Sequence, residues 1–417
     1  MFNTLSIDLT KKIDKNTKKN NGIYFTPNSI IEKMYKYLLS HLANMNCSIY
    51  TICEPSCGSC QFINYLDKTM DKTLDKTMDN NIHIDGYELN NTIYDGIKEL
   101  IFTNKVSIIN KDYLLTGITT KYNLIIGNPP FYVMKKGDIP KDIENNYKKY
   151  YSGRANIFVL FIIHSIFKLE MDGILSFVLP KNFLNCLYYN SLREYINMNM
   201  SIIGIYDCSG DDYLETDQDT IIFIIQNKKG NNIKYSKIIN NNTIFNTEEG
   251  IIQINEYYKN SKSLDEMGFH VKVGSVTWNE HKDILTDDNK YTRLIYSGDI
   301  KNNKFVPQKY KDSLKKNFIK REGNSGPCLV VNRGYGKGKY KFSYCIIDMD
   351  SDYLIENHLI CIIPKIDKKM EKDELLDIYN RIVESFNNPL TEKFIGLYFA
   401  NNAINCKELE MILPIYK

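Results

Sequence analysis

The stretch LIIGNPPFYV, Leu124 to Val133, joins a run of apolar residues to a stiff corner. Three consecutive apolar residues, Leu124 to Ile126, predict an interior strand. Pro129 and Pro130 end that strand, because proline fixes φ and offers no N–H to a sheet. The corner therefore lies at the carboxyl end of a strand, which is the edge where ligands bind in open α/β sheets.

Strand and helix patterns alternate on both sides of this stretch. Helices are predicted at residues 28–41, after residue 61 and at 157–169. Further strands are predicted at residues 49–53, 82–87, 106–110, 173–179, 202–206 and 220–226. This alternation predicts an α/β fold, with βαβ units around a mostly parallel sheet.

The pattern also divides the chain. A length of 417 residues is enough for two domains. Residues 1–20 are polar and rich in lysine, which predicts a loose amino-terminal arm, and residues 21–245 form the alternating domain. After Phe245 glycine-rich, lysine-rich and β-branched segments follow, so residues 246–417 are predicted to form a second domain.

The composition is that of an ordinary globular protein, with 43% hydrophobic and 25% charged residues. The longest apolar stretch, which starts at Ile157, is too short to cross a bilayer. Ten cysteines, several of them inside predicted strands, suit a reducing compartment better than a disulfide framework. We expect a soluble intracellular protein without a membrane partner, in the cytoplasm of a bacterium or of a virus-infected host cell.

Three more predicted strands end in polar or small residues. The segment ICEPSCGSCQF, residues 52–62, ends a strand in a turn of small residues that opens a helix, so a ligand can approach its backbone. Glu88 in IDGYELN ends the next strand, and a carboxylate there can accept hydrogen bonds from ribose hydroxyls. Asp112 and Tyr113 in NKDYL end the third. The cysteines of the first segment lack a second CxxC or a histidine, so we predict no metal.

In this order, the motifs resemble those of S-adenosylmethionine-dependent DNA N6-adenine methyltransferases. The resemblance is to the restriction-modification subgroup of bacteria and large DNA viruses, which has the cofactor motif first and target recognition last. GIYFTP, residues 22–27, resembles the amino-terminal motif of the family, and EPSCGSC resembles its first Rossmann motif. The resemblance implies a Rossmann-like class I methyltransferase mixed sheet with helices on both faces, followed by an α+β target-recognition domain.

S-adenosyl-L-methionine is the cofactor that this resemblance implies. The residues that would bind it are Tyr24, Thr26, Pro27, Glu54, Ser56, Gly58, Glu88, Asp112, Tyr113 and Asn128. One position departs from the family pattern, because Cys60 stands where a second glycine is usual. We expect this small residue to be tolerated.

NPPF resembles the catalytic motif, so Asn128, Pro129, Pro130 and Phe131 are the predicted catalytic residues. The Asn128 amide oxygen and the Pro129 carbonyl can accept the two hydrogens of adenine N6, which localises its lone pair. Phe131 can stack on a base that has left the duplex. The predicted substrate-binding residues are Phe131, Lys181 and Asn182 in VLPKNFL, Tyr213 in DDYLETD, and Arg333, Lys337 and Lys339 in NRGYGKGKY.

Duplex DNA is the predicted partner. The residues before Gly22 are too few to hold a nuclease, so a cognate restriction endonuclease would be encoded separately. Three alternatives stay open: a protein glutamine methyltransferase, which shares NPPF; an RNA adenine methyltransferase; and a catalytically silent DNA-binding relative. A glutamine methyltransferase would not need the basic second domain, and cofactor binding would exclude the silent relative.

Overall fold

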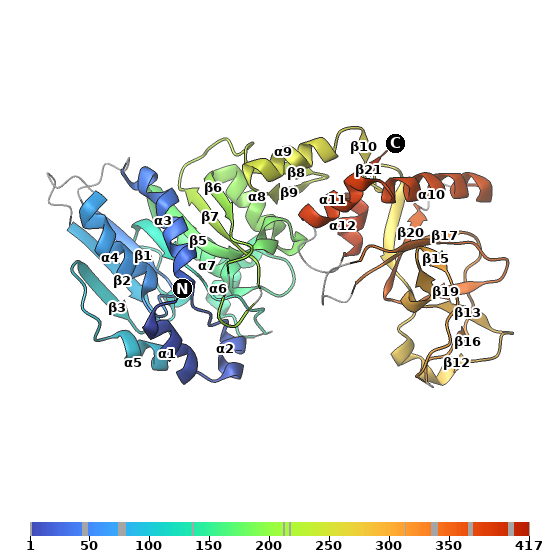
Figure 1. Ribbon diagram of the computed structural model, residues 1–417, viewed down its shortest axis with the longest axis horizontal. Coiled ribbons are helices and arrows are strands. Elements are labelled where there is room, and N and C mark those ends of the chain that lie inside the picture. The colour runs from blue at the N-terminus through green and yellow to red at the C-terminus, as the bar shows by residue number, and fades with distance from the viewer. Residues whose placement is uncertain are drawn as a thin grey trace. The chain divides into compact units, whose positions relative to one another are not determined.

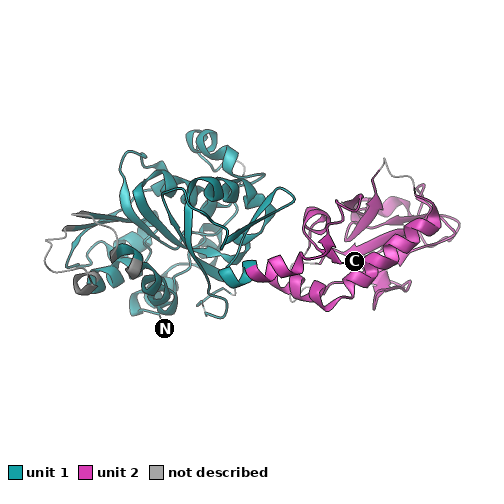
Figure 2. Cartoon of the chain, turned by 90° about the horizontal axis from the view of Figure 1, so that it is seen from above, with its two compact units in different colours: residues 1–251 teal, residues 252–417 magenta. Residues whose placement is uncertain are grey.

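The computed structural model describes residues 2–43, 49–73, 81–135, 137–211, 213–216, 218–312, 314–334, 341–365, 370–398 and 404–416. The chain forms two compact units, residues 1–251 and 252–417, coloured separately in Figure 2. The predicted boundary followed Phe245, at the end of β9 (Asn242–Phe245), whereas the units divide inside α9 (Glu248–Tyr257).

Unit 1 is built on a seven-stranded sheet with the order β3-β2-β1-β4-β5-β7-β6 (Figure 1). Strand β7 runs antiparallel to both β5 and β6, and the other neighbours are parallel, so the predicted mixed and mostly parallel sheet is confirmed. The strands are β1 (Ile49–Glu54), β2 (Asn81–Tyr87), β3 (Lys105–Ile109), β4 (Tyr122–Gly127), β5 (Leu169–Pro180), β6 (Ser201–Asp207) and β7 (Thr220–Gln226).

Both faces of this sheet are covered, as predicted. Leu124 and Ile126 of β4 pack into one hydrophobic cluster, whereas Ile125 packs into the other, because successive side chains of a strand point to opposite faces. The first cluster contains residues of α3 (Asn28–Ala43), α4 (Gln61–Thr73) and α5 (Asn91–Ile97). The second contains residues of α6 (Lys141–Tyr147), α7 (Ile157–Phe167) and α8 (Asn190–Asn199).

The prediction of a loose amino-terminal arm was wrong. The segment forms α1 (Thr4–Lys12) and α2 (Lys15–Asn21), and Leu9 and Ile13 are buried in the cluster of α3 and α4. The Ser6 hydroxyl, also buried, lies 2.8 Å from that of Ser59 and donates to Gln61 Oε1 at 2.8 Å. Apolar residues spaced by four gave this lysine-rich segment a buried stripe that its composition concealed.

The parallel strands place the predicted site residues at one edge of the sheet. In the pairing register Glu54 lies opposite Gly86, Tyr87 opposite Ile109, and Gly127 opposite Phe177. The loops that follow β1, β2, β3, β4 and β5 therefore emerge side by side at the carboxyl edge.

After the seven-stranded sheet, unit 1 contains a small hairpin that pairs β8 (Ser236–Ile239) with β9.

Unit 2 has the predicted α+β character. In unit 2 one sheet has the order β11 (Phe269–Val273), β20 (Leu359–Pro364), β17 (Cys328–Asn332), β18 (Tyr344–Ile347), and another the order β12 (Leu285–Thr286), β16 (Phe318–Ile319), β13 (Thr292–Ile295), β19 (Tyr353–Ile355). Short pairs are β10 (Ser261–Lys262) with β21 (Ile415–Tyr416) and β14 (Ile300–Lys301) with β15 (Lys304–Phe305); the helices are α10 (Lys372–Phe386), α11 (Pro389–Tyr398) and α12 (Cys406–Met411). Among the described residues, no helix has the length and apolar character needed to cross a membrane.

Candidate active site

The corner after β4 holds the Asn128 amide in a defined orientation. Its Nδ2 donates to Thr26 Oγ1 at 3.0 Å and to the Tyr24 carbonyl at 3.4 Å. Its Oδ1 is buried and has no hydrogen-bond partner among the described residues. A buried acceptor without a partner is costly for a folded protein, so its presence here indicates a position reserved for a donor from a ligand.

The rest of the corner is held by its neighbours. Ser56 Oγ donates to the Asn128 carbonyl at 3.1 Å, which joins the loop after β1 to the loop after β4. The ring of Phe131 is partly exposed and meets Phe158 edge-on, with ring centroids 6.0 Å apart. Gly22 ends α2 with φ +62°, and a Cβ at this position would stand 2.7 Å from the Phe131 backbone nitrogen. The backbone of the corner can approach α2 this closely because residue 22 has no side chain.

Glu88 joins two loops at the cofactor edge that the sequence predicts. Its Oε2 accepts the Gly58 N–H at 3.0 Å, and its Oε1 accepts the Asn90 N–H at 2.7 Å. Burial raises the pKa of this carboxyl above its ordinary value, and the backbone donors oppose that rise. Each carboxylate oxygen can accept a further hydrogen bond, so Glu88 fixes the turn of residues 55–60 while keeping acceptor capacity for a ligand.

Glu54 ends β1 and lies between this edge and the corner after β4. It is 1% exposed, and its Oε2 has no partner among the described residues. Its Cγ would lie 3.4 Å from a Cβ built on Gly127, the last residue of β4. Burial raises the pKa of Glu54 well above its ordinary value. An unpartnered carboxyl oxygen between two strand ends fits a donor such as the ammonium group of an amino acid.

The third strand end carries Asp112, whose Oδ1 accepts the Leu114 N–H at 2.9 Å and whose pKa is raised by burial. The side chain of the next residue, Tyr113, does not lie at the edge. It is 2% exposed, and its hydroxyl lies 3.0 Å from Ser165 Oγ, so it packs in the core beneath the edge. Leu89, which none of the sequence motifs singles out, follows Glu88 and is 65% exposed. An exposed apolar side chain beside two acids can cover the face of a flat ring.

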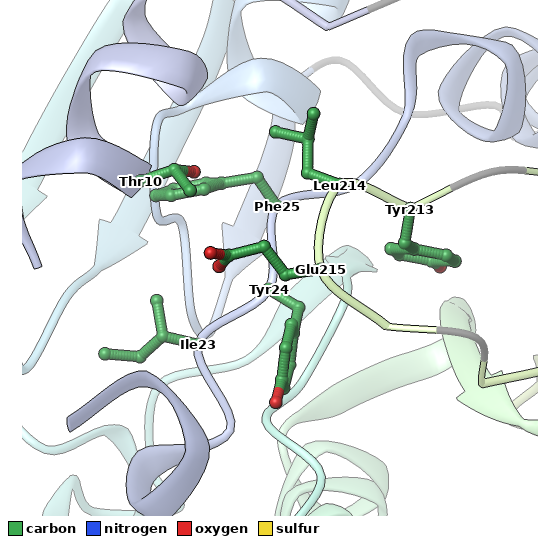
Figure 3. A pocket seen from close by; sticks show the side chains of 7 residues that line it. All are labelled: Thr10, Ile23, Tyr24, Phe25, Tyr213, Leu214 and Glu215. Carbon is green, nitrogen blue, oxygen red and sulfur yellow. The ribbon is translucent and has the colours of Figure 1, made fainter. Parts of the chain in front are cut away.

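Two predicted site residues, Tyr24 and Tyr213, line one pocket together with Thr10, Ile23, Phe25, Leu214 and Glu215 (Figure 3). The Tyr213 hydroxyl lies 3.3 Å from Thr220 Oγ1. Lys18 of α2 is buried and forms an ion pair with Glu215 at 2.7 Å. The amino-terminal helices thus contact both the corner after β4 and the loop that carries Tyr213. Pro27 is buried in front of α3, and its carbonyl accepts the N–H groups of Ile30 and Ile31.

The remaining predicted substrate-binding residues lie in different parts of the chain. Lys181 Nζ is engaged by Asp207 at 2.6 Å and by Ser209 Oγ at 3.0 Å. Asn182 has a buried Oδ1 without a partner among the described residues. Arg333 is exposed in unit 2, whereas Lys337 and Lys339 lie outside the described residues.

Cys60, the departure from the family pattern, is fully buried and has φ +57°. This is the left-handed region, which glycine adopts without the steric cost that a Cβ brings. The backbone therefore keeps the shape that a glycine would give, with some strain. No group of His, Cys, Asp and Glu in the described part of the chain could hold a metal ion.

The chain is similar in sequence to a methylase family and to individual methyltransferases of viruses and bacteria. Residues 33–214 match the family model of the Eco57I restriction-modification methylase. The type II methyltransferase M.CvrRI of Paramecium bursaria Chlorella virus XZ-6E is 25% identical over 100% of this chain and 99% of its own. The modification methylase CviBIII of Paramecium bursaria Chlorella virus NC1A is 24% identical over the same shares, and M.AccI of Acinetobacter calcoaceticus is 30% identical over 46% of this chain and 34% of its own.

Two solved structures share the fold at low sequence identity. The type IIL restriction-modification enzyme MmeI, solved in complex with DNA, has a TM-score of 0.51 and 12% identity, over 86% of this chain and 65% of its own. The DrdV–DNA complex has a TM-score of 0.52 and 12% identity, over 96% and 57%. Together with the strand order, these likenesses support a class I methyltransferase fold for the chain. The family match and the methyltransferase relatives support S-adenosylmethionine as the cofactor. Residues 33–214 of the chain are thus similar to a restriction-modification methylase.

Adding a methyl group at Gly22 should disturb both folding and activity. For Gly22→Ala we expect a loss of about 1–2 kcal/mol in unfolding free energy, because alanine is strained at φ +62°. Its Cβ would also push the backbone at Phe131, so methyl transfer should slow by at least about tenfold. Urea denaturation and a transfer assay measure the two effects. Gly117→Ala is the control, because the nearest atom to its Cβ is 3.7 Å away; equal behaviour of the two variants would contradict the close approach.

Two substitutions at Cys60 separate backbone strain from lost packing. Cys60→Ala and Cys60→Gly both remove the sulfur, but only alanine keeps a Cβ at φ +57°. We expect the glycine variant to be more stable than the alanine variant by about 1 kcal/mol in urea denaturation. This order reverses the usual ranking of the two residues, so an alanine variant of equal or greater stability would show that the backbone is not left-handed.

Proposed function

We propose that this protein transfers a methyl group from S-adenosylmethionine to N6 of an adenine in duplex DNA. The observation that carries the proposal is the Asn128 amide. Thr26 and Tyr24 take its donors, and its buried Oδ1 is left as an unpaired acceptor. An exocyclic amine is a donor that such an acceptor can receive.

The chemistry requires acceptors rather than a strong base. The lone pair of adenine N6 is delocalised into the ring, so the amine is a poor nucleophile. Asn128 Oδ1 and the Pro129 carbonyl accept hydrogen bonds from the two N–H groups of this amine. These bonds favour a pyramidal nitrogen with a localised lone pair. Pro129 and Pro130 keep these acceptors rigid, so little reorganisation is needed during the reaction.

The residues of the first three strand ends fit the cofactor, which supplies a methyl group on a positively charged sulfur. Glu88 receives the ribose hydroxyls with its remaining acceptor capacity, and Asp112 receives the adenine amine of the cofactor. Glu54 Oε2, which is buried and has no partner among the described residues, accepts a hydrogen bond from the ammonium group of the methionine part of the cofactor. Leu89 covers one face of the cofactor adenine, because its side chain is exposed beside Glu88.

The target base must leave the duplex, since N6 is inaccessible inside the helix. Phe131 offers its partly exposed ring for stacking, and Tyr213, in the loop after β6, is the candidate for the opposite side. Unit 2 and its exposed Arg333 supply contacts to phosphates and groove edges. Two of the relatives are named as a type II methyltransferase and a modification methylase, which supports this assignment.

The test is to incubate the purified protein with labelled S-adenosylmethionine and unmethylated DNA, and to map the modified base. The proposal expects N6-methyladenine at one short sequence. Label in RNA or in protein glutamine instead would favour the corresponding rival activity. Cofactor binding without transfer to any of these would contradict the proposal, and loss of cofactor binding would favour a silent DNA-binding protein.

A further inference from the structure

Arg193 of α8 is a buried guanidinium that the chemistry above does not use. It is 0% exposed. Its Nε donates to the Thr243 carbonyl at 2.6 Å, its Nη1 to the carbonyls of Phe183 at 2.9 Å and Cys186 at 2.8 Å, and its Nη2 to the Asn185 carbonyl at 3.3 Å. Removing a charged group from water is costly unless hydrogen bonds compensate. The main chain around Arg193 is therefore fixed by an interaction that it cannot easily give up.

Three of these carbonyls belong to the segment Lys181–Cys186, which follows β5 directly (Figure 1). Because Gly127 of β4 pairs with Phe177 of β5, this segment emerges beside the catalytic corner. The ring centroids of Phe183 and Phe158 are 6.0 Å apart, and so are those of Phe158 and Phe131. Arg193 therefore binds, from the protein interior, the segment that borders the part of the site proposed to receive the target base.

The same segment is also fixed from outside. Lys181 forms an ion pair with Asp207 and bonds Ser209, in the strand and loop of β6. Between Lys181 and the Arg193-bound carbonyls lies Asn182, whose buried Oδ1 has no partner among the described residues. Two anchors on either side of an unpaired amide are what a rigid contact to a ligand requires.

We propose that Arg193 is a positioning residue for methyl transfer. By binding the carbonyls of Phe183, Asn185 and Cys186, it fixes Asn182 and the aromatic side chains next to the target base. The inference rests on the proposed function, because it concerns the substrate side of that same site. Arg193 touches no reacting atom and acts through the segment alone.

The sheet separates this role from cofactor binding. Glu54, Glu88 and Asp112 follow β1, β2 and β3, whereas the Arg193-bound segment follows β5. Loss of Arg193 should therefore change transfer to the substrate and leave cofactor affinity nearly unchanged. A residue with a purely structural role would change both in proportion to the folded fraction.

Arg193→Ala tests the proposal. We expect the transfer rate per folded molecule to fall by about 10- to 100-fold, because the segment shifts when its carbonyls lose their donors. Cofactor affinity, measured by calorimetry, should stay within about twofold, a change below 0.5 kcal/mol. Hydrogen exchange should speed up selectively in the peptide that contains residues 181–186. Guanidinium ion at low millimolar concentration should restore part of the rate by filling the vacated position.

Ile196→Ala is the matched control, because Ile196 is fully buried on the same helix and contributes apolar packing alone to the core. It should lower stability, keep the rate per folded molecule, and show no rescue by guanidinium. Arg193→Lys, which keeps the charge and fewer donors, should fall between wild type and alanine. Equal losses in the alanine variants of both positions, without rescue, would overturn the positioning role.

The exchange measurement keeps the two proposals apart. If the wild-type protein transfers no methyl group, the proposed function fails whatever Arg193 does. Faster exchange in residues 181–186 of Arg193→Ala would then still support the hold on the segment, and unchanged exchange would overturn it.

Discussion

Replacing Asn128 by alanine should slow methyl transfer by about 10²–10³-fold, the cost typical of removing one hydrogen-bond partner of a transition state. The substitution removes the side-chain acceptor that Asn128 offers to the target amine, and Pro129 keeps its carbonyl. Cofactor affinity should fall much less than the transfer rate, because Glu54, Glu88 and Asp112 are untouched. Single-turnover kinetics with labelled S-adenosylmethionine, combined with calorimetry, separates the two quantities.

Asn199→Ala is the control for this experiment. Asn199 is exposed at the end of α8, and its amide bonds the Tyr195 carbonyl four residues earlier on the same helix. This variant should be as active as wild type. If Asn128→Ala transferred methyl groups at the wild-type rate, the amide oxygen could not be the acceptor for N6, and the proposed reaction would lose its main support.

Glu88→Ala should weaken cofactor binding on the order of 100-fold, as expected for the loss of charge-assisted hydrogen bonds worth about 3 kcal/mol. The substitution removes the proposed ribose acceptor. It also leaves the Gly58 N–H, which Glu88 holds at 3.0 Å, without its partner, so the turn of residues 55–60 loosens. Calorimetric titration with S-adenosylmethionine measures the affinity directly.

Two further variants define the origin of that loss. Glu99→Ala, an exposed acid in the same unit, should bind the cofactor as wild type does. Glu88→Gln keeps the shape but presents an amide NH₂ to a backbone N–H, so it should lie between wild type and alanine. Wild-type affinity in Glu88→Ala would mean that the cofactor does not contact this strand end.

The fold was predictable because its strands are buried runs of apolar residues that end in recognisable turns. Thr220–Gln226 and the run before Asn128 are of this kind, and their neighbours in the sheet follow from the βαβ alternation. The amino-terminal helices were missed, because few apolar residues carry their buried stripe. A lysine-rich composition says little about where Leu9 and Ile13 point.

The candidate site was predictable at the level of strand ends and less so at the level of side chains. Sequence order places Tyr113 after Asp112, but only packing decides that its ring turns into the core towards Ser165. In the same way, Lys181 meets Asp207 across 26 residues of chain, which no local pattern reveals. The orientation of Asn128 depends on Thr26, more than a hundred residues earlier.

Translation that began at an internal methionine would remove the contact between Thr26 and Asn128. The next methionine after Met1 is Met34, inside α3. A product initiated there would keep every strand of the sheet, the NPPF motif and unit 2. It would lack Tyr24 and Thr26, the partners that orient the Asn128 amide, and Gly22, against which the corner packs. Such a shortened protein would also lose Leu9, Ile13, Ile30 and Ile31 from the hydrophobic core of unit 1, so it would lack both a correctly held acceptor and part of the packing that stabilises the sheet.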